Sequence, residues 1–444
     1  MRLFGTDGVR GVANEDLSPE LVFRLGRAAA HVLSVDGARF LIGRDTRLSG
    51  PMLEAALVAA ICSTGGAAIR AGVVPTPAVA YLSRTADAVG VAISASHNPV
   101  EDNGLKFFGA DGFKLPDAVE EAIEQALSRS DLRRPTGVGV GPVEELPDAA
   151  ERYVEYIADL AETSAAGLRV VVDCAYGAAT SVAAMLWERL GATIIAINDT
   201  PDGARINVGC GSTSPDVVAQ AVLEQGADIG FAHDGDADRV IAVDETGQVV
   251  DGDAIMGLCA MRLQAEGRLP GDVVVATVMS NLGLELALRA RGIRLERTRV
   301  GDRYVLERMR ELGARLGGEQ SGHVIFLDHA TTGDGLVTAV QVANVMLGTD
   351  RRLSELAAPI GRYPQVLKNV RITARDGVLD HPAMRAAVAD AQRRLADRGR
   401  ILVRLSGTEP VVRVMVEAED ATQAEALASE IIDIIVRTVG APPT

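Results

Sequence analysis

Residues 67–93 read AAIRAGVVPTPAVAYLSRTADAVGVAI, and this stretch decides the fold class. The runs at 67–72 and 88–93 have the apolar composition of buried strands, and residues 76–85 between them have the composition of a helix. A strand, a helix and a second strand in this order form a βαβ unit. The stretch therefore predicts a mostly parallel sheet covered by helices.

The same alternation continues along most of the chain. Apolar strands end in polar loops near residues 94 and 234, which we interpret as a weak internal repeat with three α/β copies. Since ligands of open α/β sheets bind beside strand ends, these loops are expected to share a cleft. The other strand–helix successions are 39–44 with 51–65, 168–173 with 179–191 and 192–197, and 272–278 with 283–292 and 293–298.

The C-terminal part of the chain has a different pattern. Residues 399–420 predict two strands around a glycine turn, and residues 389–397 and 421–439 predict helices on either side. This is the pattern of a small α+β domain. The expected fold is therefore α/β, with three similar domains that have mixed or parallel sheets and a C-terminal α+β domain. The predicted ranges are 1–163, 164–257, 258–366 and 367–444.

Composition and charge narrow the classes of function. The chain has 444 residues, 48% of them hydrophobic, and a net charge of −16 from 60 acidic and 44 basic residues. Such a charge disfavours nucleic acid as a partner. The four cysteines form no CxxC pair, and neither a secretory signal nor a membrane span is visible. We expect a cytoplasmic protein with no membrane partner.

The polar segment SASHNP (94–99) follows the strand at 88–93 directly. Asn98-Pro99 favours a turn, which would expose the two serines. A serine hydroxyl is a weak nucleophile unless it is activated or already carries a group. The spacing is not that of a GxSxG elbow. The residues alone leave open whether Ser94 or Ser96 is used, whether His97 is structural, and whether the segment only caps the strand.

The segment HDGDADR (233–239) carries three alternating carboxylates, Asp234, Asp236 and Asp238. They would repel one another without a cation, although a solvated surface loop is an alternative. The spacing also opens an EF-hand, but Arg239 stands where that loop needs glycine, and both flanks are strands rather than helices. A strand-end turn with few oxygen ligands suits Mg²⁺, which takes its remaining ligands from water and phosphate.

Four further segments are candidates for binding or catalysis. RLSGTEPVVR (404–413) combines a glycine turn, two hydroxyls and two arginines, which favours a phosphate cradle. GGEQSGH (317–323) offers sugar-binding side chains or is simply a turn. Arg10 lies in the glycine-rich FGTDGVRG (4–11), and Lys106 in DNGLKFF (102–108) is either an acid/base group with a lowered pKa or an ordinary snorkelling lysine. Together the segments indicate phosphoryl transfer on a phosphosugar.

At this point the chain resembles the α-D-phosphohexomutase superfamily, and within it the branch that acts on glucosamine phosphates. The resemblance covers nearly the whole chain, because the family's motifs occur in the family's order. They are FGTDGVRG, ISASHNP, DNGLKFF, DGDADR, VGDRYV (300–305), GGEQSGH, TTGDG (331–335) and RLSGTEP.

The resemblance implies four domains around a central cleft and a role for each motif. Ser96 would be the phosphorylated serine, and its phosphate would hold Mg²⁺ together with the three aspartates. Lys106 would be the general acid/base, and Arg239 would lie near the reacting phosphate. The other residues that it implies are Arg10 and His97 beside the phosphoserine, Glu319, Ser321 and His323 at the sugar, and Arg404, Ser406, Gly407, Thr408 and Arg413 at the distal phosphate.

The resemblance also implies a reaction, the interconversion of glucosamine 6-phosphate and glucosamine 1-phosphate through phospho-Ser96 and a 1,6-bisphosphate. Two alternatives stay open: a related mutase for glucose or mannose phosphates, and a metal-dependent phosphatase with an aspartate nucleophile. The residues fix neither the first source of the phosphate nor an oligomeric state, although members of the family often form homodimers.

Overall fold

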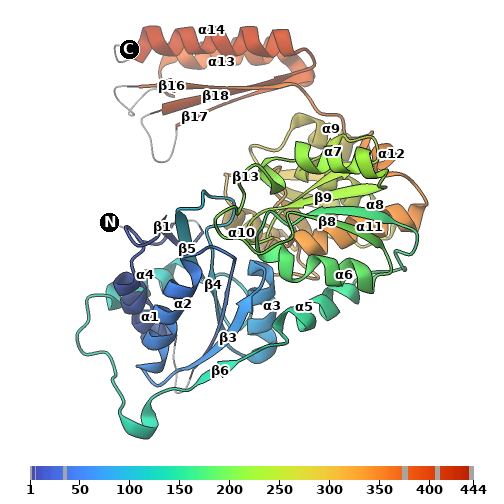
Figure 1. Ribbon diagram of the computed structural model, residues 1–444. Coiled ribbons are helices and arrows are strands. Elements are labelled where there is room, and N and C mark those ends of the chain that lie inside the picture. The colour runs from blue at the N-terminus through green and yellow to red at the C-terminus, as the bar shows by residue number, and fades with distance from the viewer. Residues whose placement is uncertain (1–2, 6, 34–37, 373–378, 406–410, 440–444) are drawn as a thin grey trace. The chain divides into compact units, whose positions relative to one another are not determined.

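A computed structural model describes residues 3–5, 7–33, 38–372, 379–405 and 411–439 (Figure 1). The chain forms two compact units, residues 1–277 with 296–358 and residues 278–295 with 359–444. The described strands form four sheets, of six, five, four and three strands. This confirms the predicted α/β fold with a C-terminal α+β domain, while the domain boundaries at residues 163, 257 and 366 stay predictions.

The first sheet consists of Val9–Val12 (β1), Arg39–Arg44 (β2), Ala67–Val73 (β3), Val89–Ile93 (β4), Asp102–Phe108 (β5) and Val143–Glu145 (β6). Its order is β1-β5-β4-β2-β3-β6. The predicted βαβ unit is present as β3, helix Thr76–Ala86 (α3) and β4, with β2 parallel to both strands and between them. Strand β5, which the sequence pattern did not predict, runs antiparallel to β4 and β1.

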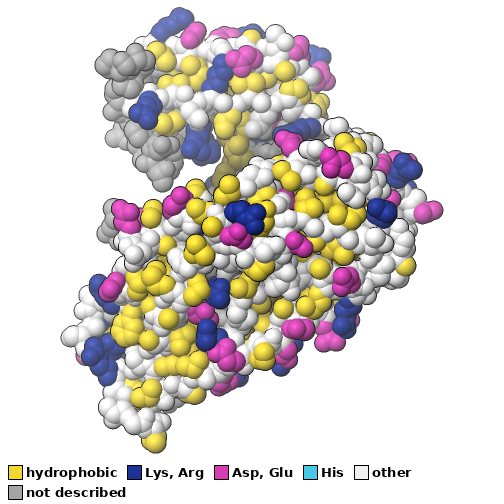
Figure 2. Space-filling view, viewed as in Figure 1, with side chains coloured by type: hydrophobic (Ala, Val, Ile, Leu, Met, Phe, Trp, Pro, Cys, Tyr) yellow, Lys and Arg dark blue, Asp and Glu magenta, His cyan; other side chains and the backbone are white. Residues whose placement is uncertain are grey.

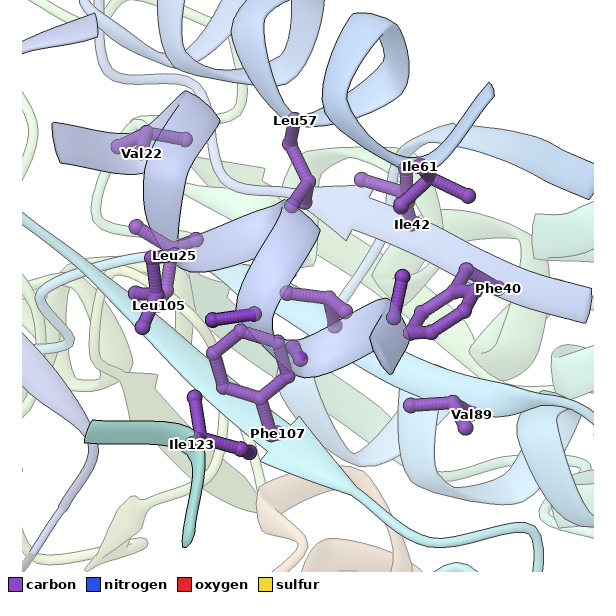
Figure 3. Packing of buried hydrophobic residues seen from close by; sticks show 14 of the residues in the cluster. Val22, Leu25, Phe40, Ile42, Leu57, Ile61, Val89, Leu105, Phe107 and Ile123 are labelled. Carbon is purple, nitrogen blue, oxygen red and sulfur yellow. The ribbon is translucent and has the colours of Figure 1, made fainter. Parts of the chain in front are cut away.

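Three helices cover one face of this sheet: Pro19–Leu33 (α1), Gly50–Cys62 (α2) and Asp117–Ala126 (α4). Their apolar side chains pack on the strands in one buried cluster. Figure 3 shows Leu25 of α1 beside Leu105 of β5, and Leu57 of α2 and Phe107 of β5 belong to the same cluster. Burial of apolar area is the main driving force for such packing, so the cluster fixes β4 and β5, which carry Ser96 at their junction and Lys106.

The second sheet has the order β11-β10-β9-β7-β8. Strands β7, β8 and β9 are parallel, and β10 runs antiparallel to β9. The predicted helix at 179–191 is interrupted, because Val182 has a non-helical φ of −134° between a 3-10 turn at Ala178–Ser181 and α6. The bounds are Arg169–Asp173 (β7), Thr193–Ile197 (β8), Ile229–His233 (β9), Val240–Asp244 (β10), Val249–Val250 (β11), Ala149–Ala158 (α5), Ala183–Arg189 (α6) and Asp216–Gln225 (α7).

The third sheet has the order β13-β12-β14-β15. Strand β14 is parallel to β12 and forms an antiparallel hairpin with β15, whose turn carries the motif GGEQSGH. The bounds are Val273–Thr277 (β12), Arg294–Thr298 (β13), Leu316–Gly318 (β14), Val324–Phe326 (β15), Gly252–Ala265 (α8), Asp302–Leu312 (α10), Gly335–Thr349 (α11) and Leu353–Ala357 (α12).

The C-terminal sheet is antiparallel, with the order β16-β18-β17. Alternate residues of β18, among them Val412, Val414 and Val416, form a buried cluster with Leu427 and Ile431 of α14. The two strands and the last helix lie where the sequence predicts them. The bounds are Gln365–Arg371 (β16), Gly399–Leu405 (β17), Val411–Ala418 (β18), Leu282–Ala290 (α9), Pro382–Leu395 (α13) and Ala421–Val439 (α14).

The surface carries both signs of charge. On the face shown in Figure 2, Lys and Arg side chains are interspersed with Asp and Glu side chains over the described residues. None of the helices in the described part of the chain is long and apolar enough to cross a membrane. All four cysteines are buried and unpaired.

Candidate active site

Ser96 lies in the loop that follows β4. Its backbone has a φ of +55°, an unusual conformation for a residue with a side chain. Ser94 stabilises this turn, because its hydroxyl accepts a hydrogen bond from the Ser96 N–H at 2.9 Å and donates one to Asp45 at 2.6 Å. The two serines therefore have different environments. The hydroxyl of Ser94 is used in hydrogen bonds that hold the turn, and that of Ser96 points toward the loop that follows β9.

Arg47 also fixes the loop of Ser96, and the sequence analysis did not identify it. Its buried guanidinium pairs with Asp45 at 3.1 Å and donates to backbone carbonyls around Ser96. Five donors in a fixed fork suit this task. The only signal in the sequence was the placement of RDTR at the end of the strand at 39–44. The carbonyls belong to Ser96 (3.1 Å), Asn98 (2.8 Å), Asp102 (2.9 Å) and Pro99.

The three predicted metal ligands lie together at the end of β9. Asp234, Asp236 and Asp238 are buried, and one oxygen of each lies within 4.8 Å of the others. The Ser96 hydroxyl donates to Oδ2 of Asp234 at 2.6 Å. The structure therefore brings the serine and the acidic trio into one site, as the sequence predicts.

Three buried carboxylates this close together repel one another, and a bound cation would reduce the repulsion. Burial and the neighbouring Asp238 and Asp236 raise the pKa of Asp234 well above its usual value. Among the described residues, Oδ1 of Asp236 and Oδ1 of Asp238 are buried without a hydrogen bond. Carboxylate oxygens grouped in this way fit a hard divalent cation such as Mg²⁺ or Ca²⁺. The solvated-loop alternative is excluded by the burial.

Lys106 enters the site from β5 and is 1% exposed, so it is not a snorkelling lysine. Its ammonium lies 2.9 Å from Asp236, 3.1 Å from Asp238 and 3.2 Å from Asp7. Burial alone would lower its pKa, but these three carboxylates raise the pKa well above the usual value. The expected lowering by neighbouring cations is wrong, because carboxylates from other segments surround the amine.

Three further predicted groups, His97, Arg10 and Arg239, lie around the loop of Ser96. Nδ1 of His97 lies 3.3 Å from the serine hydroxyl oxygen, and burial with the nearby Arg239 and Arg10 lowers the pKa of His97 to about 4. Arg10 donates to Asn98 at 3.2 Å and pairs with Asp7. The imidazole is therefore neutral at pH 7, and the positive charge that a phosphate would meet comes from the two arginines.

The sugar-loop candidates form the turn between β14 and β15. Glu319 and Ser321 are accessible, and Glu319 accepts a hydrogen bond from the Gly301 N–H at 3.1 Å. His323 is buried instead: the Gly333 N–H donates to its Nε2 at 3.1 Å, and its Nδ1 lies 3.6 Å from Asp238. The segment is a turn, and it also presents side chains beside the acidic trio. Its binding of sugar hydroxyls stays a prediction.

The distal phosphate candidates lie in the second compact unit. Arg404 of β17 and Arg413 of β18 are directly opposite each other. Burial, and then Arg413, lowers the pKa of Arg404. Like charges directly opposite each other on neighbouring strands repel. Ser406, Gly407 and Thr408 lie outside the described residues.

Comparisons with known proteins agree with this arrangement. Residues 1–134, 151–247, 251–363 and 367–434 match the α/β/α domains I, II and III and the C-terminal domain of the phosphoglucomutase/phosphomannomutase family. The chain is 58% identical to the phosphoglucosamine mutase of Desulforudis audaxviator, over 98% of this chain and 97% of that protein. It is also 58% identical to that of Moorella thermoacetica, over 96% of this chain and 97% of the relative.

Solved structures share the fold. The crystal structure of a phosphoglucomutase/phosphomannomutase family protein from Burkholderia thailandensis has a TM-score of 0.83 and 26% identity, and covers 100% of this chain and 99% of its own. N-acetylphosphoglucosamine mutase from Aspergillus fumigatus, in complex with GlcNAc-6P and magnesium, has a TM-score of 0.68 at 18% identity, over 98% and 95% of the two chains. The chain matches all four domains of the family and is 58% identical to curated relatives over nearly its full length. It therefore belongs to the phosphoglucosamine mutases of the α-D-phosphohexomutase superfamily.

Proposed function

We propose that this protein interconverts glucosamine 6-phosphate and glucosamine 1-phosphate, with phospho-Ser96 as the phosphoryl donor and acceptor. The observation that carries the proposal is the 2.6 Å contact between Ser96 and Asp234 inside a buried acidic trio. The 58% identity to relatives named for this reaction supports the choice of substrate. The product would supply amino-sugar nucleotide synthesis for cell-wall precursors.

The reaction consists of two phosphoryl transfers. In the first, the P–O bond to Ser96 breaks, a P–O bond to the free sugar hydroxyl forms, and the net proton transfer is from that hydroxyl to the departing Ser96 oxygen. The 1,6-bisphosphate then reverses its orientation, and its other phosphoryl group returns to Ser96. Lys106 is the candidate acid/base, and the ammonium form held by the three carboxylates suits the direction in which it donates a proton.

Magnesium is the cofactor that the site favours. Asp234, Asp236 and Asp238 would hold it together with the serine phosphate, because Mg²⁺ commonly combines few carboxylates with phosphate oxygens and water. A bound Mg²⁺ ion would neutralise charge on the transferring group. Arg10, Arg239 and neutral His97 would hold the phosphate oxygens from the other side.

The remaining candidates bind the part of the sugar that is not reacting. Glu319, Ser321 and His323 are assigned to the sugar end, and Arg404 and Arg413 to the distal phosphate together with Ser406, Gly407 and Thr408. A bisphosphate that reverses its orientation needs a second phosphate site of this kind. Arg404 and Arg413 are directly opposite each other on β17 and β18, and this pair of guanidinium groups supports that role.

A competition assay tests the proposal. The purified protein is incubated with Mg²⁺ and equal concentrations of glucosamine 6-phosphate, glucose 6-phosphate and mannose 6-phosphate, and the three 1-phosphates are quantified. Glucosamine 1-phosphate should form fastest. Faster conversion of glucose or mannose phosphate would instead support the related mutase, and release of inorganic phosphate would support the phosphatase.

Two properties of the protein in the cell belong to the same proposal. We expect it in the cytoplasm, where sugar phosphates are made and consumed, and we expect a homodimer of the kind frequent in the family. Light scattering on the purified chain distinguishes a dimer from a monomer, and cell fractionation locates the protein.

A further inference from the structure

Lysine is rare in this chain and is concentrated at the active site. Of 44 basic residues, three are lysines, at positions 106, 114 and 368. Two of these three have buried ammonium groups in the first unit, whereas Lys368 forms an exposed pair with Glu425 in the second. A chain that otherwise uses arginine thus has the compact ammonium group at positions 106 and 114, where carboxylates approach closely.

Lys114 is brought beside Lys106 by a tight turn after β5. The chain reverses through residues 109–113, and Lys114 pairs with Phe108 in an isolated β-bridge. Gly112 in this turn has a φ of +77°, and a Cβ there would lie 2.6 Å from the carbonyl oxygen of Ala80. Thr331 of the motif TTGDG donates to the Gly112 carbonyl. The turn, and with it the position of Lys114, is therefore fixed on two sides.

The Lys114 ammonium lies between two carboxylates. It contacts Oδ1 of Asp7 at 2.5 Å and also pairs with Asp302, and the Lys114 side chain is 10% exposed. The other oxygen of Asp7, Oδ2, contacts the ammonium of Lys106 at 3.2 Å. Burial opposes the charge on Lys114, but Asp302 and Asp7 raise its pKa, so the ammonium form is retained. The four groups form a continuous chain of alternating charge.

At the Asp302 end, this row of alternating charges lies next to the turn between β14 and β15, which carries Glu319. Asp302 is the first residue of α10, and the preceding Gly301 N–H donates to Glu319 at 3.1 Å. The next residue, Arg303, pairs with Asp117 and Glu120 of the first domain. Lys114 therefore lies at the junction between the acid/base lysine and the loop that holds Glu319.

We propose that Lys114 is a positioning residue for phosphoryl transfer, which fixes Asp7 against Lys106 and ties this pair to the loop of Asp302. The inference rests on the proposed function. Without the ammonium group, Asp7 and Asp302 would repel each other, and Asp7 would no longer be held on the side of Lys106. Catalytic groups displaced by about 1 Å can lose about 100-fold in rate.

Lys114→Met tests the role, since methionine retains an unbranched apolar stem. We expect kcat for glucosamine 6-phosphate to fall by about 100-fold, a loss typical of misplaced catalytic groups, with a smaller change in KM. Lys368→Met is the matched control and should retain wild-type kcat. A Lys114→Met kcat close to that of the wild type overturns the inference, while a wild-type protein that is inactive although Ser96 is phosphorylated would instead reject the proposed function.

Chemical rescue separates positioning from a loss of folding. In Lys114→Cys, the new thiolate displaces bromide from 2-bromoethylamine and forms an S–C bond, which restores an ammonium at nearly the lysine length. A cavity of about 130 Å³ lined by Lys114, Asp302 and Arg303 gives the reagent access. All four native cysteines are buried, and burial raises the pKa of their thiols, which slows their alkylation.

We expect the alkylated Lys114→Cys protein to recover most of the wild-type kcat, while the same treatment leaves the wild-type protein unchanged. Peptide mass mapping verifies alkylation at position 114. Full alkylation of a folded protein without recovery of kcat would contradict the inference, because the charge would then be present and ineffective. If the thiol does not react, the kcat of Lys114→Met decides.

Discussion

The hydroxyl oxygen of Ser96 lies 2.6 Å from Oδ2 of Asp234, although 138 positions separate the two residues in the chain. The contact joins two sheets, because Ser96 follows β4 and Asp234 follows β9. Both loops leave the carboxyl end of a strand, which is where open α/β sheets place their ligands. The serine hydroxyl and the acidic trio are therefore brought together from the ends of strands in two different sheets.

The buried acidic trio predicts a strong response to magnesium. Mg²⁺ that binds only the folded state stabilises it, by about 2.7 kcal/mol at a concentration 100 times its dissociation constant. We expect the melting temperature to rise with added Mg²⁺ and to fall with EDTA. In Asp234→Asn the magnesium affinity should drop by more than about tenfold, which is the range for disturbed metal sites. Asp390→Asn, at an exposed aspartate, is the control and should respond like the wild type.

The absence of a side chain at Gly235 allows the loop of Ser96 and the loop of Asp234 to approach each other closely. A Cβ at this residue would lie 2.6 Å from the Ser96 carbonyl oxygen, closer than real contacts allow. Gly235→Ala should therefore separate the loops and reduce kcat by about 100-fold, as for other small displacements of reacting groups. Gly361→Ala, where nothing lies within 4 Å of the added Cβ, serves as the control. Steady-state kinetics that are equal in both variants would contradict the close approach.

We expect the substitution of Arg47 to lower the free energy of unfolding by a large amount. Its side chain and that of Asp45 are both 0% exposed, so Arg47→Met would leave a buried carboxylate without its cation. Such a change costs about 3–5 kcal/mol. Arg39→Met removes the exposed pair with Glu144 and should cost less than about 1 kcal/mol. Urea unfolding of the two variants measures the difference, and similar losses would show that the Arg47 pair contributes no more than a surface pair.

Because His233 is buried, we expect the folded protein to lose stability in mild acid. Burial lowers its pKa to about 4, an effect that its contact with the Arg239 carbonyl partly offsets. The unfolded chain, with a histidine pKa of about 6.5, binds a proton that the folded chain refuses. This contribution is therefore complete above pH 6.5 and is lost as the pH falls from about 6.5 to about 4.

The size of this effect can be isolated with His233→Asn, which removes the titrating ring. Between pH 7 and pH 4.5 the wild type should lose roughly 2 to 3 kcal/mol more free energy of unfolding than the variant, because one pKa unit corresponds to 1.36 kcal/mol. Urea titrations at both pH values measure the two losses. An equal loss in both proteins would show that His233 titrates normally in the folded state.

Local patterns in the sequence were sufficient for β4 and β9, two of the strands that carry the site, but not for β5. Each of the two ends in a polar motif that the residues alone marked as a candidate. Ser96 and Ser94 could not be separated in this way, because their difference depends on Asp45, a partner from another strand end. The resemblance to the family, rather than the spacing, selected Ser96.

Other features depend on partners that are distant in the chain. The carboxylates that surround Lys106 come from residues 7, 236 and 238, so the direction of its pKa shift could not be predicted from DNGLKFF alone. Strand β5 begins with Asp102 and Asn103, which mask its strand pattern. Nothing in the sequence around Arg47 indicates its carbonyl partners, which lie about 50 residues further along the chain.

The most direct test of the account follows a labelled phosphate through one turnover. Protein phosphorylated on Ser96 with ³²P, by reaction with labelled glucosamine 1,6-bisphosphate, is mixed with excess unlabelled glucosamine 6-phosphate in a rapid-quench apparatus. The account predicts that the label leaves Ser96 and enters the sugar phosphates as fast as glucosamine 1-phosphate forms, and that Ser96→Ala is inactive but folded. Label that stays on Ser96 while glucosamine 1-phosphate accumulates would contradict it.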